Sequence, residues 1–146
     1  MAHPSVNICY FAFRSRPSVY DIDRIASISE HFIVFDSSIT ISEFHVMSAF
    51  KEAKRVFSKN SKYRRLGTLF LMYLTGNDQI ESAIRSARIT QNTENFISIL
   101  LGEQKCEDIL KLLPENVCLI ERPIPVDIPE KDRKIFDAMT MVSLKL

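Results

Sequence analysis

The residues with the clearest capacity for chemistry form a basic block over positions 51–65. The block holds a single acid, Glu52, and seven basic residues: Lys51, Lys54, Arg55, Lys59, Lys62, Arg64 and Arg65. Its net charge is therefore +6, whereas the whole chain of 146 residues carries only +1. One strongly basic face on a near-neutral protein is typical of a surface that binds a polyanion, most often nucleic acid. The alternative is a solvated helix face followed by a basic loop.

Aromatic residues accompany the block. Phe44 falls on the basic side of an expected long helix, where a purely solvated helix would carry a polar residue. Tyr63 lies inside the block itself, and a half-buried loop position is an equally good interpretation of it. Basic side chains bind phosphates with release of counterions, and aromatic rings stack on unpaired bases. This combination suits a single-stranded nucleic acid.

Catalytic patterns are missing from the sequence. The three histidines, at positions 3, 31 and 45, form no HxxxH or HExxH motif, and no serine occupies a GxSxG motif. The three glycines are too few and too scattered for a phosphate-binding loop. We therefore expect no enzyme activity, metal, cofactor or small-molecule substrate. His45 borders an apolar stripe, so we expect a structural imidazole that donates to a backbone carbonyl; a general base, or a Cys–His pair brought together by the fold, are the alternatives.

Cysteine usage and hydropathy indicate the compartment. Cys9, Cys106 and Cys118 show no CxxC spacing and lie in apolar surroundings, which predicts buried free thiols in a reducing compartment. The first residues lack the basic and apolar regions of a signal peptide. The longest apolar run, 66–74, is about half of the roughly 20 residues that cross a membrane. We expect a cytoplasmic protein without membrane contact, also nuclear if the source is eukaryotic.

The elements that must position these residues follow from hydrophobic periodicity. Apolar runs predict strands over 6–13, 32–35, 96–101 and 117–120. Helices are predicted from Asp21, from a Thr40–Glu43 capping box, over 65–74 with Gly76 as its end, from Asp78, over 106–113, and after Pro129. This order predicts an α/β or α+β fold: a single domain over 1–146 with a small mixed or antiparallel sheet of about four strands packed against a helical layer.

Two helical stripes bear on partners. Ile80, Ala83, Ile84 and Ala87 share one stripe of the helix that follows Gly76. The last helix carries a wide apolar stripe that includes Phe136, Met139 and Met141. Methionine-rich stripes are common on partner-binding surfaces, but docking of the last helix on the sheet would explain the same pattern.

The run SEFHVMSAFKEAKRVF, followed by LFLMYLTGNDQIESAIRSARI, resembles the kinase-binding small subunit of the KEOPS (EKC) complex, the PRPK-binding protein family. The matching features are a His-hydrophobic-x-x-Ala helix start at His45 and a Gly-x-x-Gln-Ile turn formed by Gly76, Gln79 and Ile80. The C-terminal IFDAMTMVSLKL also resembles the family's final helix. The chain differs from archaeal members at Asp78 and Arg88, where they usually carry Arg and Gly.

The resemblance implies a non-catalytic subunit that binds and activates the atypical kinase/ATPase of KEOPS. It also implies recruitment of tRNA through the 3′ CCA end, for threonylcarbamoyladenosine modification. On this basis the residues expected to bind RNA are Phe44, Lys51, Arg55, Lys59, Arg64 and Arg65. Those expected at the kinase interface are Ile84, Phe136 and Met139, while Gln79 is expected to fix the turn's backbone. A pure protein-interaction subunit that binds no RNA is the alternative.

Overall fold

The computed structural model describes residues 6–28, 33–40, 42–59, 66–101, 104–121 and 142. The chain forms two compact units. The sheet unit comprises Met1–Ser38 and Arg88–Pro123, and the helical unit comprises Ile39–Ala87 and Ile124–Leu146. The helical unit thus interrupts the sheet unit in sequence. The expectation of one domain over 1–146 stays a prediction.

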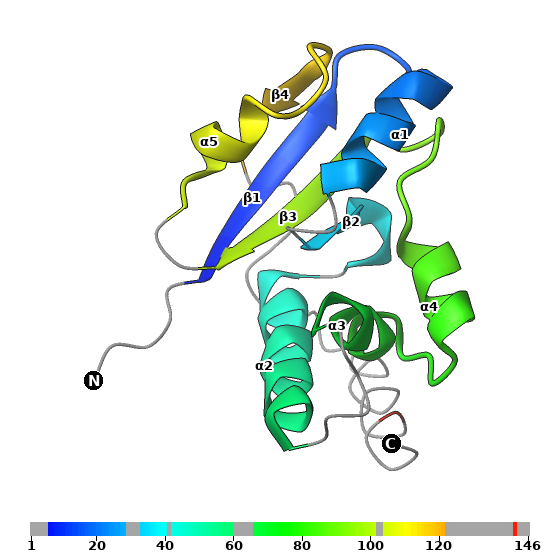
Figure 1. Cartoon of the computed structure of the whole chain (residues 1–146), viewed down its shortest axis with the longest axis vertical. Helices are drawn as coiled ribbons and strands as arrows, with labels where there is room; N and C mark the ends of the chain where they lie inside the picture. The colour runs from blue at the N-terminus through cyan, green and yellow to red at the C-terminus, as the bar shows by residue number, and fades with distance from the viewer. Residues whose placement is uncertain are drawn as a thin grey trace. The chain divides into compact units, whose positions relative to one another are not determined.

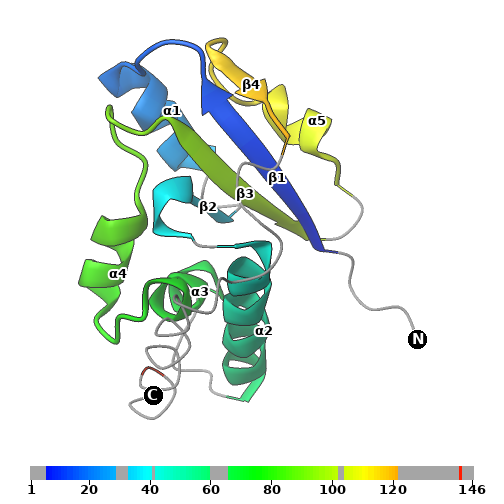
Figure 2. The same ribbon diagram turned by 180° about the vertical axis from the view of Figure 1, so that it is seen from behind.

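Four strands form one sheet: β1 (Val6–Phe13), β2 (Ile33–Asp36), β3 (Asn95–Leu101) and β4 (Val117–Leu119). Their order is β2-β3-β1-β4, which can be followed in Figure 1 and from behind in Figure 2. Each neighbouring pair in this described sheet is antiparallel. The predicted α+β class with about four strands is therefore confirmed, and the sheet is antiparallel rather than mixed.

Side chains alternate between the two faces of this sheet. On the first face Cys9 lies opposite Ser98, and Phe11 lies opposite Phe96. On the second face Ala12 lies opposite Cys118. Both faces carry buried apolar residues, which accounts for the nearly continuous apolar sequences of β1 and β3.

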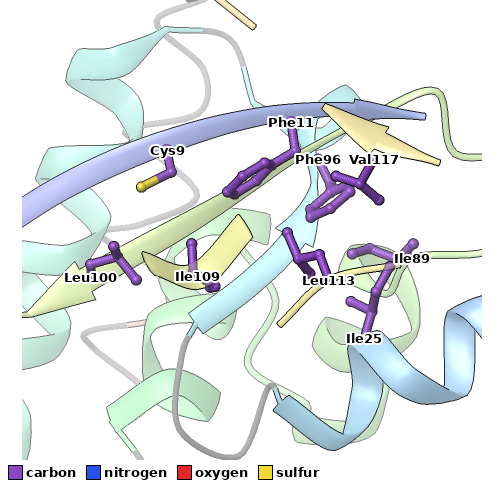
Figure 3. Close-up of a cluster of buried hydrophobic side chains, with 9 residues drawn as sticks. All are labelled: Cys9, Phe11, Ile25, Ile89, Phe96, Leu100, Ile109, Leu113 and Val117. Carbon is purple, nitrogen blue, oxygen red and sulfur yellow. The ribbon is translucent and has the colours of Figure 1, made fainter. Parts of the chain in front are cut away.

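Two short helices pack on the first face of the sheet: α1 (Val19–Ile28) and α5 (Cys106–Leu110). Ile25 of α1 and Ile109 of α5 belong to the same buried cluster as Phe11 and Phe96, as Figure 3 shows. The two phenylalanine rings stack with centroids 5.1 Å apart. Removing these side chains from water stabilises the sheet unit, because aromatic and aliphatic groups bury large apolar areas.

The chain passes from β2 into the helical segment and comes back from it into β3. Side-chain hydrogen bonds join the two ends of that segment within the sheet unit. The Thr93 hydroxyl donates to Oδ2 of Asp36 at 2.7 Å, and the Ser37 hydroxyl donates to the Asn95 carbonyl at 3.1 Å. A 3₁₀ turn over Ser37–Ile39 follows β2. These bonds join positions that are 57 and 58 residues apart in the chain.

The prediction of free thiols was wrong for Cys9 and Cys106, which form a disulfide in the sheet unit. The pairing of β1 with β3 places the segment after β3 beside β1, and the two Cα atoms lie 5.5 Å apart. That distance suits a disulfide. The two cysteines are 97 residues apart in the chain, so no local sequence pattern predicts the disulfide. Cys118 is a free thiol.

Helices α2 (Glu43–Lys59), α3 (Leu66–Thr75) and α4 (Ile80–Ala87) form most of the described part of the helical unit (Figure 1). Phe50 of α2 meets Phe70 of α3 edge to face, with ring centroids 6.1 Å apart. α3 is the most buried of the three, which explains its almost wholly apolar sequence. Of the expected helix after Pro129, the structure describes only Val142, which is helical and buried.

Two predicted helix starts were wrong by two residues. α1 begins at Val19 because Ser18 caps it: the Asp21 N–H donates to the Ser18 hydroxyl, and the Ser18 N–H donates to the Asp21 carboxylate, both at 3.0 Å. α4 begins at Ile80 rather than Asp78. The start of α2 is capped by Ser42, whose hydroxyl accepts the N–H of His45 at 3.0 Å, so the N-cap residue lies two positions after the expected Thr40.

Candidate functional site

The two sides of α2 differ as the sequence predicted. Val46, Ala49, Phe50 and Ala53 are buried, whereas Phe44 and Lys51 are exposed. Phe44 is 52% exposed although it is a large apolar residue. The outer face of this helix thus presents an aromatic residue together with basic residues.

One basic residue of this face already has a partner. Nη2 of Arg55 lies 2.8 Å from Oε2 of Glu52, and Nε donates to the same oxygen at 3.1 Å. The hydrogen bonds and the charge of Glu52 raise the pKa of Arg55. Both side chains are nearly half exposed, so this pair contributes little to stability. It does reduce the positive charge that Arg55 offers to a phosphate.

The side chains of the other three basic residues predicted to bind RNA lie outside the described part of the chain. The helical backbone includes Lys59, but its side chain lies outside the described residues. Arg64 and Arg65 also lie outside them, as do Phe136 and Met139 of the predicted kinase interface. The expectations for these five residues stay predictions.

His45 is a structural residue rather than an exposed base. Its side chain is fully buried at the start of α2, and Nε2 lies 3.0 Å from the carbonyl oxygen of Leu74 in α3. Burial lowers the pKa of His45, because the charged imidazolium loses its hydration; the bond to Leu74 acts in the opposite direction and is weaker. The neutral imidazole therefore donates Nε2–H to the carbonyl, as the sequence analysis expected.

The carbonyl that His45 binds belongs to an ordered helix end. Gly76 has a positive φ of 67°, and its N–H donates to the Tyr73 carbonyl at 3.3 Å. The N–H of Asn77 donates to the Met72 carbonyl at 3.0 Å. These two bonds are those of a Schellman motif, which requires a left-handed residue and explains the glycine. His45 then satisfies Leu74, the next carbonyl of the same helix end.

Asn77, which was not predicted as a site residue, holds the turn between α3 and α4. Its side-chain oxygen accepts the N–H of Gln79 at 3.0 Å, and the Gln79 carbonyl accepts the N–H of Ala83 at 3.0 Å. Gln79 therefore takes part through its backbone while its side chain is exposed. An asparagine side chain that accepts the N–H two residues further on is a known turn signal, so the pattern was available in the sequence.

The apolar stripe predicted for α4 is divided between two sides. Ala83 and Ala87 are fully buried, whereas Ile80 and Ile84 are each 43% exposed. The larger apolar residues therefore face outward and the small ones inward, which is the reverse of a helix that only serves the core. The two exposed isoleucines lie about one helical turn apart on the same side of α4.

The surface hollows of the described residues do not contain the predicted site residues. Two open hollows flank the loop after β1, with volumes of about 530 and 380 Å³, and both include Arg16 in their lining. No predicted site residue lines either hollow. Within the described ranges, no three His, Cys, Asp or Glu side chains gather to hold a metal ion. Over the same ranges, no helix has the length and apolarity needed to cross a membrane.

A comparison with protein-family models matches residues 21–140 to the family described as "Kinase binding protein CGI-121". No curated protein matches the chain. The matched range contains His45, Gly76, Gln79 and Ile80, the residues on which the resemblance was based. The family match covers most of the chain, and the chain belongs to the CGI-121 family of kinase-binding proteins.

Proposed function

We propose that this kinase-binding protein is a non-catalytic accessory subunit of a KEOPS-type complex in the cytoplasm. It binds and activates the atypical kinase/ATPase subunit and recruits tRNA through the 3′ CCA end. The observation that carries the proposal is the outward-facing pair Ile80 and Ile84 on α4, in a family of kinase-binding proteins. The engagement of the His45 imidazole with Leu74 supports the non-catalytic part.

The kinase-binding surface centres on α4. Ile80 and Ile84 offer an apolar centre, and the exposed Glu81 and Arg85 surround it with charges of both signs. An apolar centre with a polar rim is the usual composition of a protein interface. A mixed rim is less suited to a polyanion, so we assign this face to protein and not to RNA.

The test is a binding titration of the full chain with the purified kinase subunit. Ile84→Glu places a charge in the proposed centre and should weaken binding by roughly thirtyfold or more, the effect of an interface hot spot. Val19→Glu is the matched control, because Val19 is 62% exposed on α1 in the sheet unit. Equal affinity of the Ile84→Glu variant and the control would remove α4 from the interface.

The tRNA surface centres on the outer face of α2. Phe44, Lys51 and Arg55 fall at intervals of seven and four residues, which places them on one side of the helix. Lys51 and Arg55 suit phosphates and Phe44 suits an unpaired base, so a single-stranded 3′ end fits this face better than a duplex.

A titration with intact tRNA and with tRNA lacking its 3′ CCA, at two salt concentrations, tests this assignment. Lys51→Glu should weaken binding to intact tRNA and lower the salt slope by about one unit. Lys111→Glu in the sheet unit is the matched control, since it reverses an exposed lysine elsewhere. Equal binding of both tRNAs by the unaltered protein would argue against recognition of the 3′ end.

The second candidate is a pure protein-interaction subunit that binds no RNA. The ion pair between Arg55 and Glu52 favours it, because the pair neutralises part of the basic face. Under this alternative, tRNA retention is absent at low salt while kinase binding remains sensitive to Ile84→Glu. The two titrations therefore separate the candidates.

A further inference from the structure

We propose that the Cys9–Cys106 disulfide is a reversible thiol-exchange site, opened at Cys106 by a small thiol such as glutathione and assisted by the buried hydroxyl of Ser98. The bond joins β1 to the first residue of α5 within the sheet unit. Opening it would free one end of a helix of only five residues.

The two cysteine residues differ in exposure. Cys9 is 1% exposed and lies among the buried side chains of the first sheet face, as Figure 3 shows. Cys106 is partly exposed at the start of α5. An incoming thiolate must reach the sulfur that it attacks, so exchange proceeds at Cys106, and Cys9 is the leaving group.

The exchange is balanced by two thiol molecules. The first thiolate attacks Sγ of Cys106, the disulfide bond breaks, and its electron pair passes to Sγ of Cys9. The products are a mixed disulfide at Cys106 and a Cys9 thiolate, which then takes up a proton. A second thiolate attacks the outer sulfur of the mixed disulfide, releases the Cys106 thiol and leaves as the small-molecule disulfide. The protein gains two electrons and two protons, and the two small thiols supply both.

Ser98 is placed to ease the unfavourable step, the formation of a thiolate in the apolar core. The Ser98 side chain is fully buried, and its hydroxyl has no hydrogen-bond partner within the described part of the chain. Ser98 lies directly opposite Cys9 on the same sheet face. Directly opposite side chains have their Cβ atoms about 5 Å apart, so the hydroxyl can turn toward the Cys9 sulfur. A hydrogen bond to a charged acceptor is stronger than one to a neutral acceptor, which favours the thiolate.

Cys118 is excluded from the exchange by its position. It lies opposite Ala12 on the second face of the sheet, and its sulfur is 3.7 Å from the Ala12 carbonyl oxygen. The sheet itself therefore separates this free thiol from Cys9. The Cys118→Ser variant is a built-in control for the experiment.

The experiment treats the air-oxidised full chain with reduced glutathione near neutral pH. Samples are quenched with a maleimide at intervals, and glutathione and maleimide adducts are mapped by peptide mass. We expect a transient glutathione adduct on Cys106, followed by two new thiols at Cys9 and Cys106. Cys118→Ser should leave the rate unchanged.

Ser98→Ala is the test of the hydroxyl. It should slow the opening roughly tenfold, the contribution of one hydrogen bond to a charged group. It should not lower the melting temperature of the oxidised protein, because it removes a buried hydroxyl that has no partner. Ser98→Thr, which keeps the hydroxyl, should keep the rate. The proposal would be overturned by three free thiols in the air-oxidised protein, or by a glutathione adduct that forms first on Cys9. Both of these outcomes are measured on the unaltered protein. An unchanged opening rate in Ser98→Ala would also overturn it.

Discussion

The buried imidazole of His45 makes the stability of the protein depend on pH. Burial holds the pKa of His45 below its ordinary value of 6.5. Between this lowered pKa and 6.5, the unfolded chain therefore binds more protons than the folded chain does. The sign follows from linkage: stability falls as the pH falls through 6.5, and the neutral form is favoured above it.

The change in the free energy of unfolding with pH has an upper limit, because only one proton is involved. Between about pH 7.5 and pH 5.5, a folded state that stays neutral loses at most about 1.4 kcal/mol relative to an unfolded state that titrates with the ordinary value. His45→Gln should remove this loss, because an amide can donate to the Leu74 carbonyl and does not titrate. His45→Ala should cost about 2 kcal/mol or more at either pH, because it leaves a buried carbonyl without this donor and opens a cavity.

Urea unfolding followed by circular dichroism at both pH values measures these quantities. The comparison uses the difference between the unaltered protein and His45→Gln, since other titrating groups contribute equally to both. A pH dependence that is the same in both proteins would refute the reasoning. The reasoning would also be refuted if lowering the pH made the unaltered protein more stable relative to His45→Gln.

Three further changes test the fold. Gly76→Ala should cost about 1–2 kcal/mol in urea unfolding, because φ of 67° is unfavourable for a residue with a Cβ; an unchanged midpoint would contradict the left-handed helix end. Ile25→Ala should cost about 2–5 kcal/mol and lower the melting temperature, since the side chain is 2% exposed; a loss below about 1 kcal/mol would mean that α1 does not pack on the sheet. Reduction of the Cys9–Cys106 bond should lower the free energy of unfolding by about 2–5 kcal/mol, because the bond closes a span of 97 residues; equal stability of oxidised and reduced protein would exclude it.

Local signals in the sequence were sufficient for the elements and for part of the site. β-branched and aromatic runs identified the strands, since side-chain shape favours the pleated backbone. Gly76 was recognised as a helix end because few other residues adopt a positive φ. The structural role of His45 was also predicted, because a histidine beside an apolar stripe must find a hydrogen-bond partner when it is buried.

Non-local features could not be predicted. The pairing of Cys9 with Cys106 depends on the register of β1 and β3, which no local pattern contains. The division of the predicted stripe of α4 was not visible in the sequence, because periodicity groups Ile84 with Ala83, and only the packing of the helix decides which of the two is buried. The ion pair of Arg55 depends on the choice of side-chain rotamers. Each of these features is set by tertiary contacts.

The corner where Asp36 meets Thr93 has a consequence for the order of folding. The bond between these residues closes a loop of 57 residues that contains three helices. Contacts within those helices are local and form early, whereas pairing of β2 with β3 must first overcome the entropy of closing the long loop. We expect pulsed hydrogen exchange during refolding to protect the amides of α2 before those of β2, and simultaneous protection would contradict this order. Folding of the helical segment shortens the chain between β2 and β3 and so lowers the entropy cost of their pairing. Mutations that destabilise α2 or α3 should therefore slow formation of the sheet, although neither helix is part of it.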